Sequence, residues 1–363
     1  MKRFLREIAV IIIAIAASSG ATAQTKWHNP ENAPFPVIQG QKYQEEEREG
    51  FYNRFPARAK DKVRKSVWNL SRQNAGESIV FTTDAKNITV RYTVALRHAM
   101  SHMPSTGVSG VDLYTTDGDG NEIWVAGKYS FKDTVTFRYN DIDIVNKARK
   151  YNRYTLYLPL YNELKWLEIG TEEGAAFRFE PTPSSKPIVA YGTSICQGAC
   201  ASRPGNSYQA MITRMLDCDH INLGFSGSAK AEPAIVEYLS GLNMSAFVCD
   251  YDHNAPSPEF LTNTHEKMFR SIREAQPDLP IIMMSRPKFY LSPEERERVN
   301  IMLQTYENAL AAGDRNVYCI KGCDLLSEDI RENALVDNCH PTDGGFASIA
   351  RVVEAKLREI LKM

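Results

Sequence analysis

The hydrophobic positions of the chain follow one pattern before residue 180 and another pattern after it. Between residues 63 and 180, short segments that alternate apolar and polar residues are separated by turn-forming residues; these segments are 78–83, 87–94, 110–116, 122–127, 134–140 and 154–161. Such alternation is typical of half-buried antiparallel strands. Because no stretch in this half has a convincing helical period, we expect an all-β sandwich or jelly roll.

The second half alternates between buried strands and helices. Continuous apolar runs occur at residues 187–192, 220–225, 245–251, 279–285 and 316–322, and a segment of helical periodicity follows each. In the longest of these segments, Val299, Met302, Leu303, Tyr306 and Leu310 recur at helix spacing. Five buried strands joined by crossover helices predict an α/β fold with a parallel sheet covered on both faces.

The domain division follows from this change of pattern. A length of 363 residues favours two domains over one. We expect the β-sandwich domain at residues 24–180 and the α/β domain at residues 188–363. Residues 181–187 are rich in proline and serine and are the natural linker.

The first 23 residues have the features of an export signal. Lys2, Arg3 and Arg6 precede an apolar run, and Ala21-Thr22-Ala23 fits the small-x-small cleavage rule. The apolar run is about ten residues long, against roughly 20 for a membrane-spanning helix. We therefore expect a periplasmic or secreted protein with no stable membrane insertion after the signal is removed.

Composition narrows the classes of partner. The 43 basic residues nearly cancel the 44 acidic ones, so we expect no nucleic-acid partner. Seven cysteines lie between Cys196 and Cys339. The spacings Cys196/Cys200 and Cys319/Cys323 would suit loop disulfides, but separate thiols explain them equally well.

Chemically capable residues follow the strands of the expected parallel sheet. Ser194 lies just beyond the first strand, Gly227 beyond the second and Asn254 beyond the third. Asp337 stands three residues before His340, in the loop that precedes the last helix. Because active sites of such sheets form at the carboxyl ends of the strands, we expect these residues to meet there. A serine, a histidine and a carboxylate in one place support nucleophilic catalysis.

The ordered set resembles the SGNH/GDSL hydrolase superfamily, whose domain is a flavodoxin-like parallel sheet. The resemblance implies Ser194 as nucleophile, His340 as base and Asp337 as its orienting acid. It also implies an oxyanion hole formed by the Ser194 backbone, Gly227 and Asn254. The chain departs from many members in having Gly-Thr-Ser instead of Gly-Asp-Ser at 192–194, and "DYDHNA" instead of Gly-x-Asn-Asp in the third block.

The N-terminal half carries a second resemblance. Residues 109–114, "SGVDLY", look like the Gly-x-Asp-Leu-Tyr signature of the β-sandwich domain that precedes the esterase domain in one exported subgroup. Residues 66–76, "SVWNLSRQNAG", also resemble that domain. The two resemblances together cover nearly all of the chain after residue 23.

These resemblances predict an exported serine esterase that removes O-acetyl groups from polysaccharides or oligosaccharides without a cofactor or metal. The expected partner is the acetylated carbohydrate itself. Two alternatives stay open: a lysophospholipase or thioesterase, which would need a long apolar groove, and an inactive carbohydrate-binding protein. If Asp337 does not serve His340, the candidate replacement is Asp252, which belongs to the third block of the same motif set.

Two further motifs have simpler explanations. Residues 117–121, "DGDGN", begin like a calcium loop but lack its glycine at position six, so we expect a hairpin turn. His98 and His102 are four residues apart but have no third metal ligand in sequence. The polar loop 102–110 that contains His102 is a candidate to extend over the edge of the active site.

Overall fold

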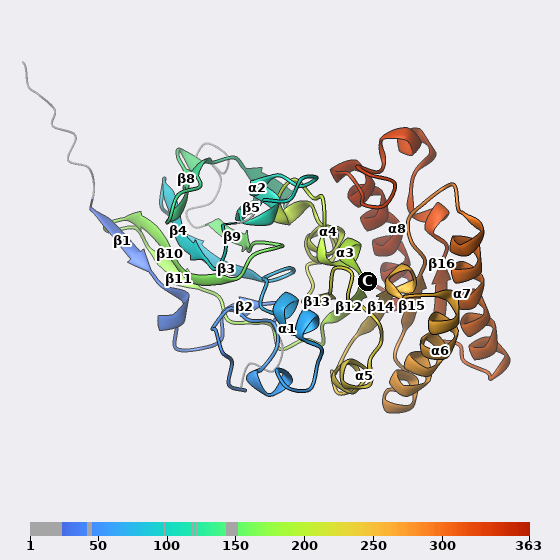
Figure 1. Ribbon diagram of the computed structural model, residues 1–363. Coiled ribbons are helices and arrows are strands. Elements are labelled where there is room, and N and C mark those ends of the chain that lie inside the picture. The colour runs from blue at the N-terminus through green and yellow to red at the C-terminus, as the bar shows by residue number, and fades with distance from the viewer. Residues whose placement is uncertain (1–23, 42–45, 98, 118–119, 121, 143–151) are drawn as a thin grey trace, which may run out of the picture.

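The structure is a computed structural model that describes residues 24–363 except 42–45, 98, 118–119, 121 and 143–151. The expected export signal therefore lies outside the described residues. Figure 1 shows two parts side by side: a β-rich part formed by residues 24–179, here the N-terminal part, and an α/β part formed by residues 188–363, here the C-terminal part.

Two antiparallel sheets form the N-terminal part. The first has the order β1-β10-β4-β8-β7 and the second β11-β3-β9-β5-β6, with β2 paired to β3. The strand bounds are β1 Thr25–His28, β2 Ile38–Gln39, β3 Ser78–Thr83, β4 Ile88–Val94, β5 Asp112–Thr116, β6 Glu122–Val125, β7 Lys128–Ser130, β8 Val135–Tyr139, β9 Asn152–Tyr157, β10 Leu164–Glu172 and β11 Phe177–Phe179.

The two antiparallel sheets share one hydrophobic core. Val90 and Ile169 of the first sheet and Phe81 and Leu113 of the second belong to the same buried cluster. Because alternate residues of the central strands face this cluster, the period-two pattern correctly predicted the sandwich. The expectation that this half has no helix was wrong, since α1 (Lys65–Ser71) and the short α2 (Ser105–Val108) both lie within it.

The C-terminal part is built on a parallel sheet of order β13-β12-β14-β15-β16. This order, 2-1-3-4-5 in chain sequence, is that of flavodoxin-like folds and confirms the predicted fold class. The strand bounds are β12 Ile188–Gly192, β13 His220–Gly224, β14 Ala246–Asp250, β15 Ile281–Met284 and β16 Val317–Ile320.

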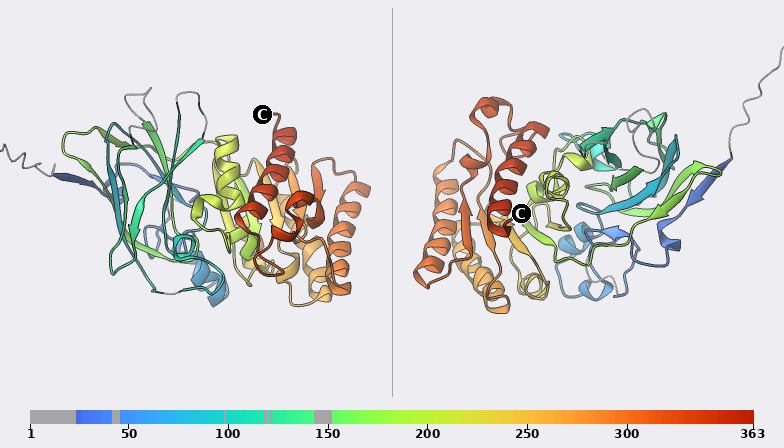
Figure 2. Two further views of the ribbon diagram at one scale, coloured as in Figure 1. Left: turned by 90° about the horizontal axis from the view of Figure 1, so that it is seen from above. Right: turned by 180° about the vertical axis from the view of Figure 1, so that it is seen from behind.

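Helices cover both faces of the parallel sheet, as the two views of Figure 2 show. Helices α3, α4 and α8 pack on one face, whereas α5, α6 and α7 pack on the other. Their bounds are α3 Ser194–Gln197, α4 Tyr208–Leu216, α5 Pro233–Ser240, α6 Pro258–Ala275, α7 Pro293–Ala311 and α8 Asp343–Leu361. Neighbouring residues of β12 point to opposite faces of the sheet: Val189 packs on the side of α5, and Ala190 packs on the side of α8.

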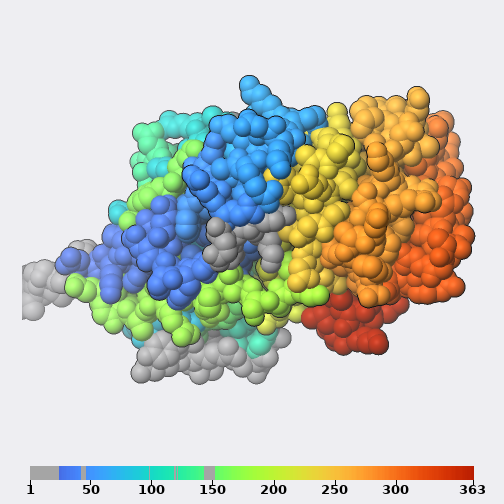
Figure 3. Space-filling model, turned by 90° about the horizontal axis from the view of Figure 1, so that it is seen from below, coloured from blue at the N-terminus to red at the C-terminus, as the bar shows by residue number. Residues whose placement is uncertain are grey.

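One segment of the N-terminal part packs with the C-terminal part. Phe55 stacks on Tyr238 of α5 at 5.3 Å between ring centroids, and Trp68 of α1 lies in the same buried cluster. The buried Arg54 guanidinium donates to the carbonyls of Asn222, at 2.8 Å, and Gly224, at 3.2 Å. Figure 3 shows the same relationship at the surface, where blue N-terminal residues border the yellow surface that includes α5.

No helix among the described residues is long and apolar enough to cross a membrane.

Candidate active site

The turn that carries Ser194 is specified by its neighbours. Gly192 ends β12 so close to β14 that a Cβ atom there would lie 1.5 Å from Asp250 Oδ1, so only glycine fits. The Thr193 backbone N–H donates to the same oxygen at 2.9 Å, and the Thr193 hydroxyl caps α3 by accepting from Ile195 N at 3.2 Å. These contacts place Ser194 at the first position of α3, where it is 6% exposed.

Ser194, His340 and Asp337 form a continuous hydrogen-bonded chain. Ser194 Oγ lies 2.8 Å from His340 Nε2, and His340 Nδ1 lies 2.9 Å from Asp337 Oδ2. Asp337 Oδ1 also accepts from the backbone N–H groups of His340, at 2.7 Å, and Cys339, at 3.1 Å. The sequence predicted these three residues to meet, and the structure brings them together.

The hydrogen bonds to Asp337 keep its carboxyl group ionised. Partial burial alone would raise the pKa of Asp337, but the hydrogen bonds from the backbone and ring of His340 lower it below its ordinary value. An ionised carboxylate at Nδ1 favours the tautomer in which Nδ1 carries the proton and Nε2 is free to accept one. In this arrangement His340 Nε2 can accept the proton of the Ser194 hydroxyl.

The two residues predicted as oxyanion donors lie in loops beyond β13 and β14. Gly227 is exposed and has φ +64°, a backbone conformation that glycine adopts without strain. Asn254 ends the 3₁₀ helix Asp252–Asn254, and its Oδ1 accepts from Ala229 N at 3.4 Å. Because this bond engages the oxygen of the Asn254 amide, its Nδ2 group is left to donate; within the described residues it has no acceptor.

Asp252 is engaged in a different pair. Its Oδ1 lies 3.0 Å from His253 Nδ1, and its Oδ2 accepts from Arg286 N at 3.2 Å. Burial alone would raise the pKa of Asp252, but the hydrogen bond from His253 lowers it. Asp252 therefore shapes the loop that carries Asn254 and makes no hydrogen bond to His340.

The Gly-x-Asp-Leu-Tyr motif, residues 110–114, contacts the segment that follows α3. Asp112 accepts from Arg203 Nη1 at 3.1 Å and from Gly205 N at 3.1 Å, while Tyr114 Oη accepts from Arg203 at 2.8 Å. Any Cβ at Gly205 would lie 2.3 Å from the Tyr114 ring. The motif therefore lies at the interface between the two parts. Its sequence alone did not indicate this contact.

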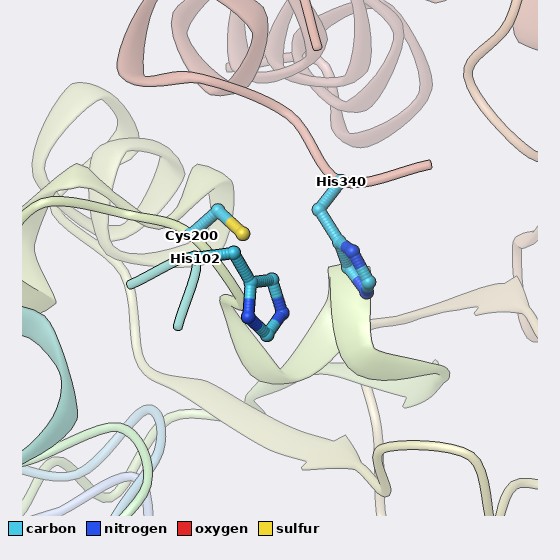
Figure 4. A group of neighbouring side chains, drawn as sticks. All are labelled: His102, Cys200 and His340. Atoms are coloured by element: carbon cyan, nitrogen blue, oxygen red, sulfur yellow. The ribbon is translucent and has the colours of Figure 1, made fainter. Parts of the chain in front are cut away.

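His102 reaches the site from the N-terminal part. Its ring centroid lies 5.3 Å from that of His340, and the ligand atoms of His102, Cys200 and His340 all lie within 4.8 Å of one another (Figure 4). The sequence offers His102 no third metal ligand, but the fold brings two further donors next to it. Two imidazoles and a thiol suit zinc, although His340 already uses both ring nitrogens for Ser194 and Asp337. The companion candidate, His98, lies outside the described residues.

The cysteines are unpaired. All seven are free thiols, so neither the Cys196/Cys200 nor the Cys319/Cys323 disulfide is formed. Burial raises the pKa of Cys200 to about 12, and the nearby Asp337 carboxylate adds to this effect. The Cys200 thiol next to the site is therefore protonated at neutral pH and is a poor nucleophile.

A cavity between the two parts lies away from Ser194. It has a volume of about 410 Å³ and lies between the N-terminal part and α4, with Tyr114, Tyr157, Arg214 and His220 in its wall. None of the residues that line it belongs to the Ser194–His340–Asp337 chain. This cavity therefore does not provide Ser194 with an acyl-binding groove.

Comparison with known families agrees with this geometry. Residues 185–358 match the GDSL-like lipase/acylhydrolase family, and residues 25–177 match the GxDLY domain, the N-terminus of SGNH-hydrolase-type esterases. The chain belongs to the GDSL acylhydrolases. No curated protein matches the chain at a significant level.

Several solved structures share the whole architecture. A protein from Bacteroides ovatus described as a GDSL-like lipase is 28% identical, with a TM-score of 0.82 over 93% of this chain and 98% of that one. A salicylyl acyltransferase from a tetracycline biosynthetic pathway is 18% identical, with a TM-score of 0.71 over 93% and 97%. An acetyl xylan esterase from Butyrivibrio proteoclasticus is 12% identical, with a TM-score of 0.57 over 93% and 99%. The last two likenesses show a common fold.

Proposed function

We propose that this GDSL acylhydrolase is a serine esterase in which Ser194 is the nucleophile, His340 the general base and Asp337 its orienting acid. The observation that carries the proposal is the unbroken hydrogen-bonded chain from Ser194 Oγ to the Asp337 carboxylate. His340 Nε2 takes the hydroxyl proton as Oγ attacks the ester carbonyl, and then returns that proton to the leaving alcohol. Water releases the acyl group from Ser194 by the same route.

The developing oxyanion is stabilised by the backbone N–H groups of Ser194 and Gly227 and by Asn254 Nδ2. Support comes from the position of both loops at the carboxyl edge of the sheet and from the Ala229 contact that orients the Asn254 amide. Donors of this kind act mainly in the transition state, where the negative charge appears.

For the substrate, we propose O-acetyl groups on polysaccharides or oligosaccharides outside the cytoplasm. Support comes from the export signal expected at residues 1–23 and from fold neighbours described as carbohydrate esterases, among them proteins from Clostridium thermocellum and Cellvibrio japonicus. Such polysaccharides are processed outside the cytoplasm, which agrees with the expected export of this protein.

The nucleophile is tested with Ser194→Ala and a fluorophosphonate that labels activated serines. The native protein should take one label, on Ser194, and the folded variant should take none and lose most esterase activity. A label on another serine, or near-native turnover by the variant, would reassign the nucleophile.

Acyl specificity separates the acetylesterase from a lysophospholipase or thioesterase. In an apolar groove each buried methylene contributes roughly 0.8 kcal/mol, about a fourfold gain in kcat/KM. We expect the opposite here: kcat/KM falling from nitrophenyl acetate through butyrate to decanoate, with acetate released from acetylated glycans. A series rising with chain length favours the lipid enzyme, and glycan binding without hydrolysis of any ester favours the inactive binding protein.

A further inference from the structure

The loop that carries His102 is anchored to the segment following the nucleophile helix. The Thr106 hydroxyl donates to the Ser202 carbonyl at 2.6 Å, and Gly107 lies so close to the Ala201 carbonyl that a Cβ there would be 2.2 Å away. Met103, next to His102, is buried in the same cluster as Ile195 of α3. His102 is therefore positioned by packing on both sides of the interface.

The imidazole of His102 remains available to a ligand. It is partly exposed, and it makes no hydrogen bond to any other residue that the structure describes. Figure 4 shows the His102 ring beside that of His340, with the Cys200 side chain above the His102 ring in this view. A neutral imidazole offers one donor and one acceptor, so it can bind a hydroxyl group in either direction.

The chemistry of ester hydrolysis determines which portion of the ester lies beside His102. The base that deprotonates the serine later protonates the leaving oxygen, so the alcohol portion of the ester must lie beside His340 Nε2. The acyl oxygen points instead toward the donors on Gly227 and Asn254. A side chain 5.3 Å from the His340 ring centroid therefore borders the alcohol and its substituents.

We propose that His102 forms a leaving-alcohol subsite, supplied by the N-terminal part, that hydrogen-bonds a hydroxyl of a polyhydroxylated alcohol such as a sugar ring. This inference rests on the proposed esterase function and adds a substrate-binding role for the N-terminal part. The sandwich would then select the alcohol, whereas the parallel-sheet part carries out acyl transfer. The subsite is assembled only when both parts are in contact.

The test compares two acetate esters that differ in the leaving alcohol. One is a mono-O-acetylated xylo-oligosaccharide, whose neighbouring hydroxyls can reach His102, and the other is 4-nitrophenyl acetate, which has none. For His102→Ala we expect the ratio of kcat/KM for the sugar ester to that for the phenyl ester to fall about tenfold, mainly through KM. His102→Gln, which keeps a donor and an acceptor, should recover part of that ratio.

Controls distinguish this subsite from the catalytic chain. Ser101→Ala changes an exposed neighbour on the same loop and should leave the ratio unchanged. Fluorophosphonate labelling of Ser194 reports the catalytic chain independently of any alcohol. If Ser194 is still labelled but the ratio is unchanged in His102→Ala, with or without an equal loss on both esters, the subsite is overturned. Hydrolysis of the phenyl ester alone by the native protein also overturns it, whereas loss of labelling at Ser194 overturns the proposed function.

Discussion

Replacing Asp112 with alanine should weaken the contact between the N-terminal part and the segment that follows α3. The Asp112 carboxylate is 3% exposed and accepts hydrogen bonds from Arg203, Gly205 and the Trp124 indole, the last at 2.7 Å. Burial raises the pKa of Asp112 by more than the Arg203 charge and these hydrogen bonds lower it, so the ion pair offsets only part of the cost of burying the carboxylate. In the alanine variant these donors lose a common acceptor.

The expected cost can be worked out donor by donor. The buried Gly205 N–H is left unpaired, which costs about 1–3 kcal/mol, and losing the charge-assisted bond from Arg203 costs about 1.5–3 kcal/mol. Arg203 is one-quarter exposed and keeps Tyr114 as a partner, and the half-exposed Trp124 can turn to water, so these terms are discounted. We expect a total of about 3 kcal/mol.

Chemical denaturation followed by circular dichroism measures this cost. Asp133→Ala removes a carboxylate that is 93% exposed and should change the free energy of unfolding by less than about 0.5 kcal/mol. A double-mutant cycle between Asp112→Ala and Arg203→Ala should give a coupling of at least about 1 kcal/mol. If Asp112→Ala behaves like Asp133→Ala, the motif does not stabilise the interface.

The remaining predictions concern the site and its surroundings. Asn254→Ala should lower kcat about 100-fold with little change in KM, and a rise in KM alone would make it a ground-state contact. His340→Ala should be more damaging than Asp337→Ala in steady-state assays, because the base transfers the proton and the acid only orients and stabilises it; equal kcat values would contradict the assigned roles. Zinc should inhibit by drawing His340 from Ser194, and His102→Ala should weaken that inhibition in a zinc titration reversed by chelator. Burial lowers the pKa of His220 to about 3, so below its ordinary pKa of 6.5 the unfolded protein binds a proton that the folded protein does not. Between these two pKa values, this group lowers the free energy of unfolding by about 1.4 kcal/mol for each unit by which the pH falls. His220→Asn should make this pH dependence less steep, as measured by denaturation near pH 5.

The parallel sheet was predictable because its signals are local. Strands buried on both faces appear as continuous apolar runs, and residues 188–192, 246–250 and 281–284 are such runs in the structure. The positions of Ser194, Gly227 and Asn254 then followed from the rule that sites form at the carboxyl ends of strands. Local pattern and chain order were sufficient for this part of the molecule.

The missed elements depend on tertiary contacts. β10, residues 164–172, is the longest strand of the sandwich, but a register shift between Leu164 and Trp166 breaks its period of two. β1 is largely exposed and, among the strands that the structure describes, pairs with β10 alone, so its own four residues carry little signal. α1 is seven residues long and is stabilised by Val67 and Trp68 packing into the core of the other part, which no local periodicity encodes.

Several of the contacts that join the two parts lie in the environment of the nucleophile. From the N-terminal part, Thr106 contacts Ser202, Asp112 contacts Arg203 and Gly205, and the Tyr161 hydroxyl donates to the Ser194 carbonyl at 3.4 Å. The Gln197 side chain of α3 in turn donates to the Leu160 carbonyl at 3.2 Å. These partners lie 33 to 96 residues apart in sequence, so a motif such as 110–114 can be recognised without its contact being known. A catalytic part expressed alone would lack both these supports and His102, which makes the sandwich a component of the active site.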